Sequence, residues 1–374
     1  MGKRELLIVL AFVLVGAAVF QFAAPPDTGT SSFSFGEFFR AARTEMRGDP
    51  GEGSFAHKEA LPAPPSLREI RLIGVSHGVQ VVGEDRDTIG YEFTVNSSGP
   101  DDPGAVELAK QTILVPDDLG DVLVLRATYP DAATQRSSVV LHLPRRLAIS
   151  IEGGRGITVS HVAGVHLESV RGDVVLTDLS GPVTGVQGDG DFTLTGAWSI
   201  KMRLTRSQSK LSHISNGVIL DIRDGDVTIA DSDGDLEIDE VRADVTVDDH
   251  GGSVTVRGSG GHIVVQRPSA DTRVDVRRAE VELLIDRGIS ATLITTDEPL
   301  RLVLSGTLAV SVDAAATNGS IQATEVGLTA DESKQSDTRT VTLSHTFGTP
   351  EHKPAGARIT LRNTRGDIVI RKRS

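Results

Sequence analysis

Between Asn216 and Gln266 the sequence repeats every nine residues. Two aliphatic positions recur at this spacing, two residues apart: Val227, Leu236, Val245, Val254 and Ile263 at the first, and Ile229, Ile238, Val247, Val256 and Val265 at the second. A small residue precedes each pair: Gly225, Gly234, Ala243, Gly252 and Gly261. Apolar side chains at alternate positions indicate a half-buried β-strand, and glycine permits a bend with an unusual φ. Repetition at fixed spacing predicts one strand-and-turn unit stacked many times.

A single nine-residue unit cannot fold alone. Ordering its backbone costs roughly 9–18 kcal/mol, whereas burying two Val or Ile side chains returns only about 3–6 kcal/mol. Each unit must therefore share both edges with its neighbours, as solenoid repeats do. An antiparallel meander is the alternative, but its hairpin turns would alternate in character, and these turns look alike. The prediction is an all-β fold: a β-solenoid or right-handed β-helix of about nine-residue units, behind an N-terminal transmembrane helix. The number of strands per coil stays open.

Composition supports a narrow aliphatic core and excludes several function classes. Of the 11 Phe residues, eight precede residue 56, so the rest of the 374-residue chain builds its interior from Val, Ile and Leu. The net charge of −13 disfavours nucleic acid as a partner. The absence of Cys removes disulfides, thiol catalysis and cysteine metal sites.

The N-terminus predicts a membrane anchor over residues 1–24. The 19 residues 6–24 carry no charge and, as a helix, would span about 28 Å, close to the hydrocarbon layer of a bilayer. Lys3 and Arg4 would hold the N-terminus in the cytoplasm and leave the rest exported. A cleaved signal peptide is the alternative, but cleavage after Ala24 would place Phe22 at position −3 and Pro25 after the cut. The expected partner of residues 6–24 is the lipid bilayer.

Residues 25–67 are predicted to be a juxtamembrane linker, because Pro, Gly, Ser and Thr punctuate them. Within the linker, Phe35, Phe38, Phe39, Ala42 and Met46 fall close to helical spacing and predict a short amphipathic helix. This helix would either cover an exposed end of the β-domain or lie on the membrane surface.

Residues 68–374 are predicted to form the β-domain, with irregular opening strands over 68–144 and regular repeats over 145–374. The opening strands are expected at Ile70–Leu72, Val79–Val82, Tyr91–Val95, Gln111–Val115, Val122–Ala127 and Val139–Leu143. The register is lost between Thr195 and Asn216, where Trp198 and the basic residues Lys201, Arg203, Arg206 and Lys210 indicate either a degenerate unit or a loop. The repeat loosens again after Gln266. Polar residues 331–339 predict a surface loop, and Ile359, Leu361, Ile368 and Ile370 restore the pattern.

Four of these segments resemble a known family: Gly172–Leu176, Asp224–Ile229, Asp233–Ile238 and Arg365–Ile370. Their Gly-Asp turn followed by alternating aliphatic residues is similar to the bacterial β-strand-repeat family labelled "putative adhesin", whose founding domain has no known function. Ile73–Gly83, and His142–Pro144 followed by Leu147–Ile151, resemble its opening strands. The resemblance covers residues 68–374. It implies an exported β-solenoid, often behind one hydrophobic anchor, and it supplies no catalytic residues.

One motif has the spacing of a hydrolase nucleophile elbow, Gly74-Val75-Ser76-His77-Gly78. That elbow requires a strand, a tight turn and then a helix. Here Val79–Val82 predicts another strand, so the motif is interpreted as a turn.

Aspartates crowd the repeat turns. Asp231, Asp233, Asp235 and Asp239 could together hold Ca²⁺, but the EF-hand and the calcium-binding β-roll both require glycines that this repeat lacks, and turn hydrogen bonding explains the residues. Asp226, Asp235 and Asp244 could belong to a polysaccharide-cleaving site. Because they recur every nine residues, consecutive ones are expected on different faces of the coil.

Two Arg-Gly-Asp tripeptides, at 171–173 and 365–367, spell a cell-attachment sequence, but both fall where the repeat places a turn. The ten His residues show no metal-ligand spacing. The sequence therefore predicts no catalytic, cofactor-binding or metal-binding residues.

The predicted function is non-enzymatic: a single-pass protein of the cytoplasmic membrane whose C-terminal β-domain is periplasmic or extracellular and serves adhesion, scaffolding or interaction. The partner would be an unidentified protein or glycan, and not nucleic acid. An envelope-stress or regulatory partner of another membrane protein is the first alternative. A polysaccharide-active β-helix enzyme is the second.

Overall fold

The computed structural model of the chain describes residues 51–305, 308–335, 337–348 and 357–373. The predicted membrane anchor (residues 1–24) and the predicted amphipathic helix (Phe35–Met46) lie outside these residues. Within the described ranges, no helix is both long and apolar enough to span a bilayer. Residues from Gly51 onward form one compact unit. As predicted, this unit is mostly β.

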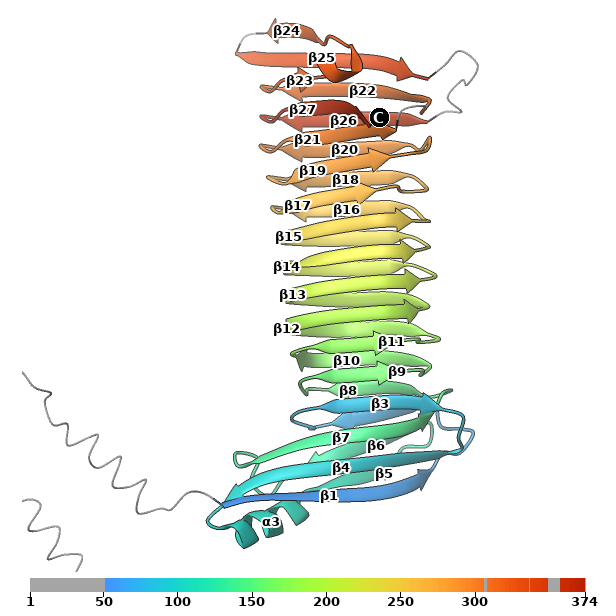
Figure 1. Cartoon of the computed structure of the whole chain (residues 1–374), viewed down its shortest axis with the longest axis vertical. Coiled ribbons are helices and arrows are strands. Elements are labelled where there is room, and N and C mark those ends of the chain that lie inside the picture. The colour runs from blue at the N-terminus through green and yellow to red at the C-terminus, as the bar shows by residue number, and fades with distance from the viewer. Residues whose placement is uncertain (1–50, 306–307, 336, 349–356, 374) are drawn as a thin grey trace, which may run out of the picture. The chain divides into compact units, whose positions relative to one another are not determined.

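Four long strands form the middle of this unit: β12 (Pro182–Ala197), β13 (Ser199–Ile214), β14 (Val218–Ser232) and β15 (Leu236–His250). They pair in parallel, with Val218 opposite Leu236 and Val227 opposite Val245. Partners are thus 18 residues apart, which is two nine-residue units. Figure 1 shows these strands as successive layers. Parallel pairing excludes the antiparallel meander for these repeats.

We call each layer a rung, with a first and a second half. Each long strand spans both halves of its rung. In the rungs beyond β12 and β15 the two halves are separate strands: β12 pairs with both β10 and β11, and β15 pairs with both β16 and β17. The first-half series comprises β8 (Ala148–Glu152), β10 (Gly164–Arg171), β16 (Val254–Ser259), β18 (Thr272–Arg277) and β20 (Ala291–Thr296). The second-half series comprises β9 (Ile157–Ser160), β11 (Val174–Thr177), β17 (His262–Gln266), β19 (Glu280–Ile285) and β21 (Leu300–Ser305).

The core lies between the two series and is almost entirely aliphatic. Alternate residues of each half-strand are fully buried, such as Ile238 in a first half and Val247 in a second half, each 0% exposed. The residues between them face outward. The predicted aliphatic positions of the repeat are therefore the core positions, as the alternation required.

The repeat's small residues act mainly through close backbone contact. Gly234 has a positive φ of 80°, as expected. Gly225 and Gly252 do not, although a Cβ there would lie 2.3 Å from the Ser207 carbonyl oxygen and 1.7 Å from the Gly234 carbonyl oxygen. Non-glycine residues at the bends also adopt a positive φ, including Asp189, Arg206, Asp224 and Arg242. The prediction that these glycines mark unusual φ angles is thus only partly correct.

The N-terminal end departs from sequence order. Its elements are β1 (Gly51–Pro62), β2 (Glu69–Ile73), β3 (Val79–Glu84), β4 (Thr88–Gly99), α3 (Asp102–Lys110), β5 (Ile113–Asp118), β6 (Val122–Thr128) and β7 (Gln135–Pro144). β2 lies between β6 and β8, and β3 between β7 and β9, all in parallel. The antiparallel pairs β4–β7, β1–β4 and β5–β6 complete this end.

Two features of this end differ from the sequence prediction. Residues 51–62, assigned to the linker, form β1, because pairing with β4 over its whole length satisfies a backbone whose Gly, Ser and Ala side chains carry little β propensity. Helix α3 was not expected. Asp101 caps it by accepting a hydrogen bond from the Gly104 amide at 2.8 Å, and an aspartate at this position is a local signal for the start of a helix.

The C-terminal end is also built out of sequence order. Its elements are β22 (Val310–Thr317), β23 (Ile321–Gln322), a 3₁₀ turn η1 (Thr324–Val326), β24 (Asp331–Gln335), β25 (Thr338–Phe347), β26 (Arg358–Thr364) and β27 (Ile368–Arg373). β26 lies between β20 and β22, and β27 between β21 and β23, in parallel. β25 then pairs antiparallel with β22, and β24 with β25.

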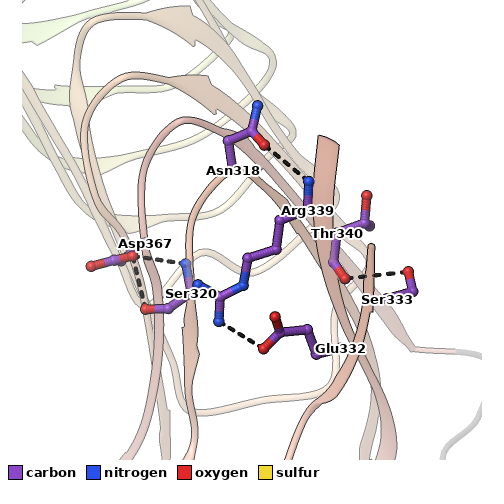
Figure 2. Close-up of polar contacts among 7 residues, drawn as sticks. All are labelled: Asn318, Ser320, Glu332, Ser333, Arg339, Thr340 and Asp367. Carbon is purple, nitrogen blue, oxygen red and sulfur yellow. Dashed lines mark hydrogen bonds and ion pairs between the residues drawn. The ribbon is translucent and has the colours of Figure 1, made fainter. Parts of the chain in front are cut away.

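The predicted surface loop at 331–339 is a β-hairpin instead. All five residues of β24 are exposed, so the polar sequence shows no alternation to reveal the strand. In Figure 2 the Arg339 amide donates to Asn318 Oδ1 at 3.1 Å, which connects the hairpin to the residues after β22. Within the hairpin, the Arg339 guanidinium donates to Glu332 at 2.8 Å. Ser320, which precedes the hairpin in the sequence, donates to Asp367 Oδ1 through its amide and its hydroxyl, both at 2.8 Å.

Candidate binding surface

Two depressions lie on the outer face of the sheet β1–β4–β7. The larger, of 690 Å³, is lined by polar side chains from all three strands, among them Ser54, Asn96 and Arg136. These three residues are neighbours across the sheet, because Ser54 is opposite Asn96 and Asn96 is opposite Arg136. Strands β4 and β7 turn Phe93, Val95, Val139 and Leu141 toward the core. The alternation that buries those residues therefore presents the polar ones outward.

The smaller depression, of 420 Å³, lies further along the same strands. Lys58 and Glu92 are opposite each other and form an ion pair at 2.9 Å. Gly90 is opposite His142. Between the two depressions the sheet carries the short side chains of Ala56, Thr94 and Ser138, which are also neighbours across the three strands.

A titratable network borders the smaller depression. His142 Nδ1 lies 2.7 Å from Glu84 Oε1, and Arg86 donates to Glu84 Oε2 at 3.1 Å. The hydrogen bond from His142 and the nearby positive charges lower the pKa of Glu84 below its ordinary value. Glu84 is therefore a carboxylate at neutral pH and holds the imidazole in place.

Tyr91 stays protonated in the same region. Its hydroxyl donates to Glu59 at 2.5 Å. Burial and the neighbouring carboxylate raise the pKa of Tyr91 well above its ordinary value. The surface thus presents fixed hydrogen-bond donors and acceptors, with charges of both signs, on a rigid sheet. This chemistry suits recognition of a polar ligand.

The aspartates singled out in the sequence do not assemble into a metal site. In the part of the chain that the structure describes, no group of three or more His, Asp or Glu side chains is placed to hold a metal ion. Asp231 occupies a bend with a positive φ of 47°, and Asp235 accepts a hydrogen bond from Ser253 Oγ at 2.6 Å. These positions agree with the interpretation that the aspartates serve the turns.

The nine-residue series Asp226, Asp235 and Asp244 divides as expected. Asp226 and Asp244 are opposite each other at the start of the second halves of β14 and β15. Asp235 precedes the first half of β15, on the other side of the rung. Asp244 accepts a hydrogen bond from the His262 amide at 2.8 Å, so it serves the backbone of the next rung.

The Gly-x-Ser-x-Gly motif lies in the turn between β2 and β3 and is followed by a strand, as predicted. Ser76 Oγ accepts a hydrogen bond from the Ser137 amide at 2.9 Å, and the Ser76 amide donates to Ser137 Oγ at 3.3 Å. His77 Nδ1 lies 3.3 Å from Ser76 Oγ. Ser76 thus links this turn to β7 and lacks the strand-turn-helix context of a nucleophile elbow.

Both Arg-Gly-Asp tripeptides lie at bends, and their side chains make contacts within the chain. Arg365 donates to both carboxylate oxygens of Asp297, at 2.5 and 3.0 Å, and Asp367 accepts from Ser320. In the other copy, Asp173 accepts from the Asp191 amide at 3.1 Å. The geometry therefore favours a structural role for these tripeptides.

The irregular segment between Thr195 and Asn216 is a rung. β13 runs through it and pairs in parallel with β12 and β14. Of the two predicted alternatives, the degenerate unit is correct. Two of its basic residues form ion pairs with the rungs on either side: Arg203 with Asp221 at 2.8 Å, and Arg206 with Asp189 at 2.5 Å.

Sequence reasoning missed the two depressions. Ser54 and Lys58 belong to the segment interpreted as a linker, and Asn96, Arg136 and His142 belong to strands whose pairing was unknown. The one usable signal was the alternation of β1, where Phe55, His57 and Leu61 are separated by small or polar residues. That signal is weak without the partner strand.

The sequence matches no family model and no curated protein. Among solved structures, the chain is similar to the crystal structure of a "putative cell adhesion protein" from Clostridium sporogenes ATCC 15579, with 10% identity, a TM-score of 0.19, and coverage of 85% of this chain and 100% of that one.

Proposed function

We propose that this protein is an exported β-solenoid that binds a protein or glycan partner without catalysing a reaction. Residues 6–24 would tether it to the cytoplasmic membrane as a single span, with the β-domain on the periplasmic or extracellular side. The role would be adhesion, scaffolding or interaction at the cell envelope.

The observation that carries this proposal is the pair of open polar depressions on the outer face of β1–β4–β7. Their lining side chains are fixed by strands whose opposite faces are in the core. A preorganised surface of this kind loses little conformational entropy when it binds a ligand. A binding role therefore follows from the geometry more directly than a reaction does.

The pairing pattern supports the solenoid interpretation. Parallel partners 17 or 18 residues apart connect β12 to β15. The strand series ends in antiparallel strands on both sides, at β4–β7 and at β22–β25. Such strands cover the open edges on which parallel stacks would otherwise associate end to end. The outward-facing side chains are then the surface left for a partner.

The test uses the full chain in detergent micelles, immobilised and exposed to membrane extract, whole cells and a set of glycans. Arg136 lines the larger depression, and Arg136→Glu should weaken retention of the partner by about tenfold or more. Arg126→Glu is the matched control, because Arg126 is an exposed arginine on β6 in the other strand series.

Retention of cells or glycans supports adhesion, and capture of one dominant membrane protein supports the regulatory alternative. If Arg136→Glu and Arg126→Glu weakened retention equally, the assignment of the binding surface to the outer face of β1–β4–β7 would be wrong. Turnover of a glycan that is lost in Asp→Asn variants would overturn the non-enzymatic role.

A further inference from the structure

One rung differs in charge from those beside it. β13 contains Lys201, Arg203, Arg206 and Lys210 and no carboxylate, although the chain has a net charge of −13. The strands on either side carry the opposite charge at facing positions, Asp189 on β12 and Asp221 on β14. An isolated basic strand in an acidic molecule sets up a local positive potential.

The outer face of the first half of β13 carries a patch of two cations, Lys201 and Arg203, with apolar side chains beside them. Lys201 and Arg203 alternate with Ile200, Met202 and Leu204, which are buried in the core. Lys201 is opposite Ile219, and Arg203 is opposite Val186. Both apolar neighbours are unusually exposed for large hydrophobic residues, Val186 at 41% and Ile219 at 45%.

The single tryptophan of the chain lies at the start of this patch. Trp198 immediately precedes β13 and is 51% exposed. Its amide donates to the Gly181 carbonyl on the preceding rung at 3.3 Å, so its backbone is held by the stack. Trp198 occupies the bend that joins β12 to β13, three residues before Lys201 in the sequence.

The four cations are not equally engaged. Arg203 and Arg206 pair with Asp221 and Asp189 of the adjacent rungs. Lys201 forms no ion pair with any described residue, and neither does Lys210, which is exposed on the second half of β13. The ion pairs with neighbouring aspartates therefore explain the presence of the two arginines, and no such pair explains the two lysines.

We propose that Trp198, Lys201 and Arg203 form a binding site for an acidic polysaccharide. This inference rests on the proposed adhesive function and names its ligand. The indole supplies a flat apolar face for a sugar ring, and the cations pair with its carboxylates. An added peptide strand is disfavoured, because both edges of β13 are already paired with β12 and β14.

Trp198 is also the reporter for the test, because its indole is the only one in the chain. The full chain in detergent micelles is titrated with short oligogalacturonates, with the same oligosaccharides methyl-esterified to remove their charge, and with polyglutamate. We expect oligogalacturonate to change the tryptophan fluorescence, and the neutral ester to do so only weakly. Lys201→Gln should weaken binding about tenfold, the scale of one lost charge-assisted contact.

Lys210→Gln is the matched control, since it removes the same charge from the opposite half of the same strand and should leave binding unchanged. Trp198→Ala, followed by calorimetry, should also weaken oligogalacturonate binding. Equal losses in the two lysine variants would overturn the site as non-specific charge attraction. An equal response to polyglutamate would reassign it to acidic peptides.

If oligogalacturonate does not change the tryptophan fluorescence, the inference is also overturned. If the chain is then still retained on cells or glycans through Arg136, the proposed function stands without this site. If neither occurs, both fail.

Discussion

The middle rungs and the two ends of the unit reach the same parallel pairing by different routes. In β12–β15 every strand pairs with the next long strand in the sequence, two nine-residue units away. At the ends, the first and last rungs of the chain are inserted one place inward: β2 and β3 against β6 and β7, and β26 and β27 against β22 and β23. The contacts that hold the inserted rungs join distant residues, such as Arg365 and Asp297, which are 68 apart.

This difference separates local from long-range specification. A middle rung is defined by its own repeat and its neighbours, so it tolerates variation such as the basic β13. An end cannot form until strands distant in the sequence pair. Once it has formed, the first or last rung of the chain lies between two other rungs. The ends therefore protect the edges that a simple stack would leave open.

The largest expected effect comes from removing the inserted C-terminal rung. Deleting residues 358–374 removes Ile359, Leu361, Ile368 and Ile370, all at most 1% exposed. At about 1.5–3 kcal/mol for each buried side chain, this amounts to roughly 6–12 kcal/mol. We expect hydrogen exchange to show lost protection throughout β22–β25. Deleting only residues 372–374 is the control and should leave β22–β25 protected, and unchanged exchange after the longer deletion would mean that the insertion does not hold the end.

Within the middle rungs, the next largest effect concerns close backbone contact. Gly252→Ala would bring a Cβ to 1.7 Å from the Gly234 carbonyl oxygen, so the rungs must separate. We expect a loss of about 1–3 kcal/mol or more in the free energy of unfolding, measured in urea. Gly188→Ala is the matched control, since nothing lies within 4 Å of its Cβ. It should be neutral or slightly stabilising, and equal losses would refute the contact argument.

A buried carboxyl in the middle rungs predicts a pH dependence. Glu240 is 1% exposed, and the charge of Asp244 acts on it. Burial raises its pKa from 4.5 to about 7. The folded state then binds the proton more tightly than the unfolded state. The contribution of Glu240 to stability is fully present below pH 4.5, and by about pH 7 and above it falls by up to about 3 kcal/mol.

Glu240→Gln keeps the shape of the side chain and removes the charge. Its urea midpoint should equal that of the native chain at pH 4 and exceed it at pH 8. The N-terminal end contains a buried amide in place of a buried carboxyl. Gln135 donates to Thr112 Oγ1 at 2.6 Å and carries no charge, so it adds no pH dependence. An identical midpoint for the two proteins at pH 8 would contradict a raised pKa.

The smallest expected effect concerns the charged bends. Arg242 donates to Asp224 at 2.6 Å and lowers the pKa of that carboxyl. The pair is exposed, and Asn also tolerates the left-handed backbone. Asp224→Asn should therefore shift the urea midpoint only slightly, and salt should remove the shift. A large, salt-independent loss would show that the bends are held by more than turn geometry.

The middle of the fold was readable from the sequence, and the ends were not. The spacing of Val227, Leu236 and Val245 predicted strands, stacking and the burial of alternate residues. It could not distinguish one strand per coil from two, because both repeat every nine residues. The division of Asp226, Asp235 and Asp244 between two faces was also predictable from that spacing.

The candidate binding surface was less accessible to sequence reasoning. Ser54, Asn96 and Arg136 come from three strands far apart in the chain, and no local pattern marks them as neighbours. The basic segment around Lys201 was visible as an interruption, but its identity as a rung was not. The pairing partners of β13 had to be known before its outward residues could be assigned to one face.

The sequence by itself determined that this chain builds a β-structure from short aliphatic repeats, because alternation and fixed spacing are local properties. The tertiary structure decided which strands close the two ends and which polar side chains share a surface. Those outcomes depend on pairing between residues distant in the chain, and the free energy of such pairing comes from both partners together rather than from either segment alone.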